Sequence, residues 1–300
     1  MKSIANGVDR RRFSKMLFSA GGLQFFDWQA LDRIIPALSY PRYDDAVAHV
    51  LPAMGYQSKI ALKDSILNLM EHGVIDRAKF FDLYGMSGPL PVEFENILSK
   101  PSDDKILLAS HNASIYVNLL WPVGLATQMA ANAESPMQGD SLYNFASTGG
   151  WTLGREQNGG AYFNKFPIVK LTDDQEALVV RIAKSTFRPC CNNSTFFQDC
   201  NHGSALLGIL QLGASQGLSE GELYREALAF NSFWFSDYYL RTALYFKVFK
   251  KTDWSDVVPQ VALGFYYSAG GPWQDNVAVQ VDAIPDLIPS VPGNGADCGV

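Results

Sequence analysis

The segment RPCCNNSTFFQDCNHGSALLG, residues 188–208, concentrates the side chains that could do chemistry. It holds three of the four cysteines of the chain and one of its four histidines. Thiolate sulfur and imidazole nitrogen are the ligands that soft and borderline metal ions prefer. The segment therefore predicts a transition-metal or thiol-redox site, with copper or zinc as the expected cofactor ahead of iron. The expected ligands are Cys190, Cys191, Cys200 and His202.

The spacing of these residues leaves two other interpretations open. It matches no CxxC, CxxCH or HExxH pattern, so residue type carries the metal prediction. One alternative is a non-enzymatic helical binding protein, in which a disulfide from Cys200 to Cys190 or Cys191 staples an irregular loop. The other is an enzyme with a cysteine nucleophile, in which a histidine acts as the base for the thiol.

The apolar run after the cluster predicts a helix that begins beside Cys200. Asp199 or Asn201 is the expected N-cap of that helix. Cys200 would then lie at the positive end of the helix dipole, which lowers the pKa of a thiol and makes it a better ligand and nucleophile. Gly203 and Ser204 leave the first turn uncrowded, so another group can approach it closely.

Several residues outside this segment are further candidates. Cys298, in a tail ending GNGADCGV, could join the cluster as a ligand or redox partner, pair in a second disulfide, or remain a free thiol. His111 begins the most apolar predicted helix and is either a further ligand or a hydrogen-bonded residue of a helix start. Three tryptophans could line a pocket closed by the glycine-rich segment 148–160, although core packing also accounts for aromatic residues. These are Trp121, Trp151 and Trp234.

The N-terminal segment DRRRFSKMLFSAGG resembles a twin-arginine export signal. Arg10 and Arg11 would form the arginine pair, and Met16–Phe26 would serve as a short apolar region before a cleavage site. The resemblance covers residues 1–39 and implies export of a folded protein, often with its cofactor already bound, to the periplasm or the extracellular space. The alternative is a basic amphipathic helix at the start of a cytoplasmic protein.

The composition is that of an acidic globular protein. Hydrophobic residues make up 47% of the 300 residues and charged residues 18%, and the formal net charge is −6. Nucleic-acid binding is disfavoured because neutralising phosphates requires clustered lysine and arginine. No apolar run reaches the roughly 20 residues that span a bilayer. The sequence points to no particular partner.

Hydrophobic periodicity predicts a mainly α fold. We expect one irregular multi-helix domain over residues 40–269, with a long glycine-rich loop, and an extended or mobile tail over residues 270–300. Thr172 and Ser219 each open a capping box, which marks the start of a helix. The expected helices cover 43–55, 58–73, 75–85, 91–98, 110–133, 171–187, 203–217, 219–235 and 236–251, and the best strand candidates cover 166–171 and 277–282.

Overall fold

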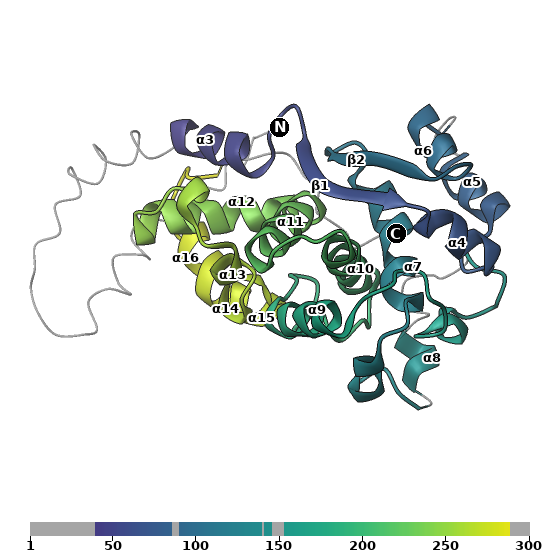
Figure 1. The fold of residues 1–300 in the computed structure, drawn as a ribbon. Helices are drawn as coiled ribbons and strands as arrows, with labels where there is room; N and C mark the ends of the chain where they lie inside the picture. The colour runs from purple at the N-terminus through teal and green to yellow at the C-terminus, as the bar shows by residue number, and fades with distance from the viewer. Residues whose placement is uncertain (1–39, 86–89, 140, 146–152, 289–300) are drawn as a thin grey trace, which may run out of the picture.

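The computed structural model describes residues 40–85, 90–139, 141–145 and 153–288 (Figure 1). Helices make up most of the described residues, and two strands form a small sheet. The mainly α, multi-helix fold predicted from periodicity is confirmed. The export-like segment 1–39 lies outside the described residues.

The elements carry the labels of Figure 1. The first half of the chain forms α3 (Tyr40–Val50), β1 (Tyr56–Lys63), α4 (Ser65–Glu71), α5 (Arg77–Gly85), α6 (Val92–Ile97), β2 (Ser102–Leu108), α7 (Ala113–Ala126), η2 (Ala130–Glu134) and α8 (Ser141–Phe145). The second half forms η3 (Gly159–Tyr162), α9 (Asp173–Ser185), α10 (Asn201–Ser215), α11 (Glu220–Trp234), α12 (Ser236–Tyr245), η4 (Phe246–Lys250), η5 (Trp254–Asp256), α13 (Pro259–Ala262), α14 (Phe265–Ser268), α15 (Gly270–Trp273), η6 (Gln274–Ala278) and α16 (Val279–Asp282).

The crossing of α7 and α10 lies at the centre of the molecule (Figure 1). Residues 203–214 of α10 are all buried. Two glycines allow the backbones to touch. A Cβ added at Gly124 would lie 1.9 Å from the carbonyl oxygen of Ser204, and a Cβ added at Gly208 would lie 2.4 Å from the carbonyl oxygen of Leu120. Only a residue without a Cβ fits at these two positions, so the crossing fixes where α10 begins.

Two buried apolar clusters lie on either side of α10. The first includes residues of β1, α4, α6 and α7, and the second includes residues of α3, α9, α11, α12 and the C-terminal short helices. Ala205, Ile209 and Leu212 pack in the first cluster, whereas Leu206 and Leu210 pack in the second. Each set follows the helical spacing of three or four residues. Since each fully buried leucine contributes roughly 1.5–3 kcal/mol, α10 is anchored from both sides.

The two strands correct one prediction. β1 pairs antiparallel with β2, with Tyr56 opposite Leu108. The helix predicted over residues 58–73 is therefore wrong in its first part, because the chain stays extended as far as Lys63 and α4 begins only two residues later. Residues 60–62 are consecutive and buried. Periodicity alone cannot distinguish such a short, fully buried run from part of a helix.

A buried carboxylate ties this sheet to α11. Glu226 is 1% exposed. It accepts hydrogen bonds from the Tyr56 hydroxyl at 3.1 Å, the Ser58 hydroxyl at 2.6 Å and the backbone N–H of Lys59 at 2.9 Å. A buried charge needs such partners to offset its lost hydration. The strand is thus stabilised by a residue far away in the sequence.

The capping boxes predicted at two helix starts are confirmed. At α9, Thr172 Oγ1 accepts from the Gln175 N–H at 3.3 Å, and Gln175 Oε1 accepts from the Thr172 N–H at 3.0 Å. At α11, the Ser219 N–H donates to Glu222 Oε2 at 2.9 Å. These bonds pair N–H groups that have no partner within the helix. α9 and α11 therefore start where the sequence predicts.

The segment after residue 269 differs from the extended chain expected there. Residues 270–282 form α15, η6 and α16, while residues 289–300 lie outside the described part. The strand predicted over residues 277–282 is wrong. Val277 and Val281, four positions apart, are both fully buried, which is the spacing of one helix face. The packing of these helices against α12 overrides the β preference of valine.

Candidate metal centre

The cysteine segment forms a loop between α9 and α10 that is held at both ends. Across its base, the Thr195 N–H donates to the Thr186 carbonyl at 2.8 Å, and the two hydroxyls lie 2.9 Å apart. The start of α15 covers the loop, because the Gly270 N–H donates to the Cys191 carbonyl at 2.9 Å. A Cβ on Gly270 would lie 2.8 Å from the Pro189 carbonyl oxygen. The backbone carrying the cysteines is therefore fixed from outside the loop.

The loop brings three sulfur atoms together. The Sγ atoms of Cys190, Cys191 and Cys200 all lie within 4.8 Å of one another, and those of Cys190 and Cys200 are 3.6 Å apart. All three are free, half-buried thiols. Around one ion with bonds of about 2.3 Å, sulfur ligands lie about 3.8–4.0 Å apart. The three cysteines could therefore close on a metal ion with only small movements of their side chains.

Cys200 is itself the N-cap of α10, a position that the sequence assigned to Asp199 or Asn201. Its backbone is extended, and its Sγ accepts from the Gly203 N–H at 3.5 Å. The predicted position of Cys200 at the positive end of the helix is confirmed. The sulfur takes the role that a serine or aspartate oxygen usually plays at an N-cap.

A buried arginine that no sequence pattern marked faces this sulfur. Arg188 is fully buried, and its Nε donates to Cys200 Sγ at 3.2 Å. Its two terminal nitrogens donate to the Asp199 carboxylate and to three backbone carbonyls of the loop. Those carbonyls belong to Asn193 at 3.0 Å, Ser194 at 2.7 Å and Phe197 at 2.9 Å. Arg188 therefore orders the loop and holds the sulfur of Cys200 at the same time.

Gly203 makes room for this arginine. A Cβ at Gly203 would lie 2.4 Å from Cζ of Arg188. The sequence predicted that a group could approach the first turn of α10 closely, and that group is the guanidinium. The sequence indicated a role for Arg188 only through its position next to Pro189, within the segment that holds the cysteines.

Hydrogen bonds and charges in the cluster shift the pKa values of its thiols in opposite directions. Hydrogen bonds from the Cys190 and Cys191 thiols, together with the charge of Arg188, lower the pKa of Cys200 well below its ordinary value. The pKa of Cys190 is raised by its hydrogen bonds to the other two thiols and by burial. The bond from Cys190 lowers the pKa of Cys191, but its contact with Cys200 and burial raise it overall. Of the three thiols, Cys200 is thus the one whose surroundings favour the thiolate, and Arg188 is the buried positive charge beside it.

His202 does not belong to the group of donor atoms within 4.8 Å. Its ring packs against Phe235, with centroids 4.5 Å apart, and against Trp234 at 6.0 Å. Burial lowers the pKa of His202, so the imidazole is neutral at pH 7. Its roles as a fourth ligand, or as a base for a cysteine nucleophile, stay predictions.

The other predicted site residues have structural contacts of their own or lie outside the described residues. His111 is exposed and immediately precedes the N-cap of α7. Trp121 is buried in the core, and the Trp234 Nε1 donates to the carbonyl of Ala113 at 3.1 Å. Cys298 and Trp151, with residues 146–152 of the glycine-rich loop, lie outside the described part.

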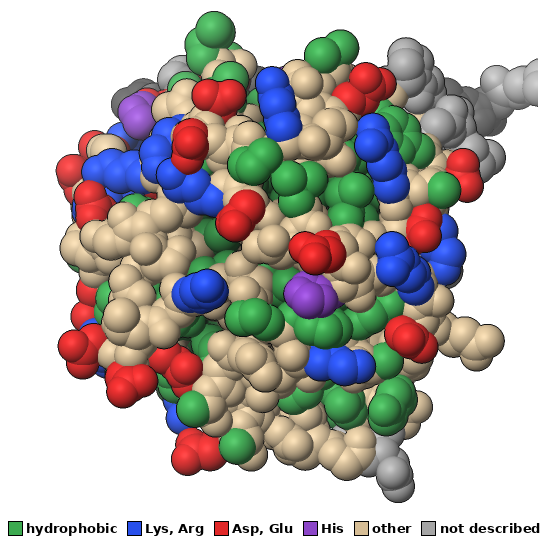
Figure 2. All heavy atoms as spheres, turned by 45° about the vertical axis from the view of Figure 1, so that its right-hand side comes forward, with side chains coloured by type: hydrophobic (Ala, Val, Ile, Leu, Met, Phe, Trp, Pro, Cys, Tyr) green, Lys and Arg blue, Asp and Glu red, His purple; other side chains and the backbone are tan. Residues whose placement is uncertain are grey.

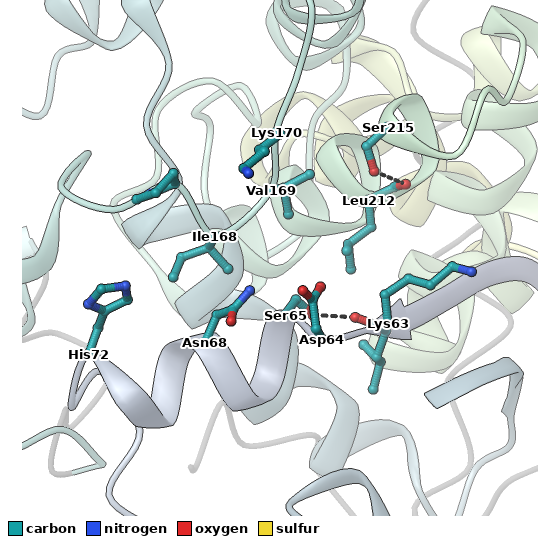
Figure 3. A pocket seen from close by; sticks show the side chains of 12 residues that line it. Lys63, Asp64, Ser65, Asn68, His72, Ile168, Val169, Lys170, Leu212 and Ser215 are labelled. Atoms are coloured by element: carbon teal, nitrogen blue, oxygen red, sulfur yellow. Dashed lines mark hydrogen bonds between the residues drawn. The ribbon is translucent and has the colours of Figure 1, made fainter. Parts of the chain in front are cut away.

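A separate pocket of about 450 Å³ opens between α4 and residues 167–170 (Figure 3). Asp64, Asn68 and His72 lie along the α4 side, and Lys170 lies opposite. None of the three clustered cysteines lines this pocket, and neither Trp121 nor Trp234 does. The pocket and the cysteine cluster therefore share no lining residue.

The surface carries no large patch of one charge on the face shown in Figure 2. Small groups of lysine and arginine side chains lie there among aspartate and glutamate side chains. Nothing on this face resembles the continuous basic surface that nucleic acids require. Within the described residues, no helix combines the length and apolarity needed to cross a membrane.

Comparison with protein-family models, with curated proteins and with solved structures finds no match for the chain.

Proposed function

We propose that the protein binds a soft or borderline transition metal through Cys190, Cys191 and Cys200. One observation carries the proposal: the three sulfur atoms of one loop converge within 4.8 Å of one another. Thiolate ligands suit Cu(I), Zn(II) and iron, and copper or zinc are the first candidates.

The surroundings of the sulfurs support this proposal. Metal ligands are generally oriented by hydrogen bonds from a second layer of residues. Arg188 and the Gly203 N–H fill that role for Cys200, and α15 fills it for the backbone of Cys191. A thiol must lose its proton to bind a metal. The guanidinium and the helix dipole offset part of the negative charge that results.

Metal content tests the proposal. Full-length protein, purified without an affinity metal, is analysed by mass spectrometry for bound metals and by a thiol count on the same sample. We expect close to one metal ion per chain, and at least a tenfold drop in occupancy for Cys200→Ser or Cys190→Ser. His49→Ala is the matched control, because it removes an exposed imidazole of α3 that pairs with Asp45. Metal-free wild-type protein that takes up no copper, zinc or iron would contradict the proposal.

Thiol redox chemistry is the second candidate, favoured by the 3.6 Å separation of Cys190 and Cys200. The Cys200 thiolate would attack a low-molecular-weight disulfide, forming a mixed disulfide and releasing one thiolate. Cys190 would then lose its proton to solvent and attack the sulfur of Cys200. This forms the Cys190–Cys200 disulfide and releases the second thiolate. Peptide mapping after treatment with glutathione disulfide tests this, and a mixed disulfide that never resolves would contradict it.

We also propose that the protein is exported through its N-terminal segment, on the strength of Arg10 and Arg11. Export of folded protein would allow the metal to be loaded beforehand. Fractionation of cells that express the full chain tests this. We expect the protein in the periplasmic or extracellular fraction, and Arg10→Lys/Arg11→Lys should retain it in the cytoplasm. Equal distribution of both forms would contradict the export proposal.

A further inference from the structure

The donor atoms of the cluster are three in number, and all are sulfur. No imidazole nitrogen or carboxylate oxygen of a described residue joins the group within 4.8 Å. Zn(II) in proteins almost always takes four ligands. With three sulfur ligands, Zn(II) would have to complete its shell with water or another ligand, whereas soft Cu(I) is satisfied by thiolates alone.

Among the described residues, two side chains next to Cys200 in sequence or space could be considered as a fourth ligand, and both already have contacts of their own. Both oxygens of Asp199 have partners: one accepts from the Arg188 guanidinium, and the other from Asn193 Nδ2 at 2.7 Å. The His202 ring packs against Phe235. Turning Asp199 toward an ion would leave part of the buried guanidinium unpaired, and turning His202 would break its ring packing.

The charge of Arg188 also favours Cu(I) over Zn(II). Its Nε lies 3.2 Å from Cys200 Sγ, so an ion bound about 2.3 Å from that sulfur lies within about 5.5 Å of the nitrogen. Repulsion between the guanidinium and the ion doubles when the ion is divalent instead of monovalent. Asp199 offsets part of this repulsion for both ions. What remains disfavours Zn(II) more than Cu(I).

We infer that the cluster is a three-coordinate Cu(I) site formed by Cys190, Cys191 and Cys200, which discriminates against Zn(II). The inference rests on the proposed metal-binding function and adds the identity and coordination number of the ion. In such a shell neither His202 nor Cys298 is a ligand.

Competition in a thiol buffer tests this. Metal-free, full-length protein receives equimolar Cu(I) and Zn(II) without oxygen, in millimolar glutathione. Glutathione is a thiolate competitor that lacks the geometry of the site. A metal ion that stays on the protein is therefore held by the arrangement of the three cysteines and not by thiolate chemistry alone. After desalting, the metals are counted by mass spectrometry and the copper shell is measured by X-ray absorption. We expect about one Cu(I) per chain with three sulfur ligands, and at least tenfold less zinc.

Variants separate the outcomes. His202→Gln and Cys298→Ser should retain copper as the wild type does, whereas Cys200→Ser should lose at least tenfold of it. The three-coordinate Cu(I) inference would be overturned if the protein retained zinc while copper stayed bound to glutathione. It would also be overturned if His202→Gln or Cys298→Ser lost copper. Either result would still be consistent with a metal site. If the wild type retains neither ion, in this buffer or in its absence, the proposed metal-binding function fails as well.

Discussion

The Nε of Arg188 lies 3.2 Å from the Sγ of Cys200. The same guanidinium, fully buried, also bonds Asp199 and three carbonyls of the loop between α9 and α10. The group that orders the loop is thus also one of the groups that lower the pKa of Cys200. Stability of the loop and reactivity of the cluster should therefore change together.

The first prediction concerns the removal of this guanidinium. We expect Arg188→Met to lower the free energy of unfolding by about 3–5 kcal/mol, because it leaves Asp199 and the loop carbonyls without their buried partner. Urea unfolding followed by circular dichroism measures this. Arg181→Met is the matched control, since Arg181 is 57% exposed and pairs with Glu220 at the surface. That change should cost less than about 1 kcal/mol. Equal losses for the two variants would show that Arg188 does not order the loop.

The second prediction concerns the space that Arg188 occupies. Gly203→Ala should destabilise the protein by about 1–3 kcal/mol, because its Cβ would fall 2.4 Å from Cζ of Arg188. It should also raise the pKa of Cys200 toward its ordinary value, since the guanidinium must retreat from the sulfur. Thiolate absorbance titration in the ultraviolet measures this shift. Gly221→Ala is the control, because its Cβ would meet only an Arg225 nitrogen at 3.9 Å. If the thiol titration of Gly203→Ala matched that of the wild type, Arg188 would not be a cause of the lowered pKa of Cys200.

The convergence of the cysteines could be predicted from sequence, because it depends on local features. The three cysteines lie within one short segment, with turn-forming residues between them and a helix directly after them. Such a segment is short enough to bring their side chains close together. The position of Cys200 at a helix start follows from the same local signals. The capping boxes at Thr172 and Ser219 were equally readable, because every partner lies within three residues.

The features that escaped prediction depend on distant contacts. Residues 58–63 have an apolar pattern that suits a helix, but pairing with β2 and hydrogen bonds to Glu226 make them a strand. Arg188 looks like an ordinary surface residue until Gly203 and the loop carbonyls surround it. Neither contact leaves a periodic signal in the sequence. Tertiary context therefore decides the residues that tune the site.

The third prediction concerns pH. In metal-free, reduced protein the pKa of Cys200 lies below its ordinary value, while the unfolded thiol titrates near 8.5. Between these two values the unfolded state binds more protons, so this contribution to stability grows as pH rises and is lost as pH falls through the folded pKa. The gap in unfolding free energy between wild type and Cys200→Ser should widen with pH up to about 8.5. Urea unfolding at several pH values measures it.

Cys191→Ser provides the opposite sign as a control. The folded pKa of Cys191 is raised, so its contribution is complete below about 8.5 and is lost as pH rises toward the folded value. The difference in unfolding free energy between wild type and Cys191→Ser should therefore be constant below about pH 8.5 and change only above it. A gap for Cys200→Ser that does not vary with pH would show that no thiolate is held there in the folded protein.

The fourth prediction concerns the helix crossing that positions the start of α10. Gly208→Ala should destabilise the protein by at least about 2 kcal/mol, because its Cβ would lie 2.4 Å from the Leu120 carbonyl oxygen, and backbone cannot move aside as a side chain can. Gly213→Ala, in the same helix, meets the end of the Leu223 side chain at 2.5 Å and should cost clearly less. Because α10 carries Cys200 at its N-cap, separating it from α7 should also weaken metal retention. Thermal unfolding and metal content on both variants measure this. A Gly208→Ala protein as stable as Gly213→Ala would mean that the crossing does not fix the position of the helix.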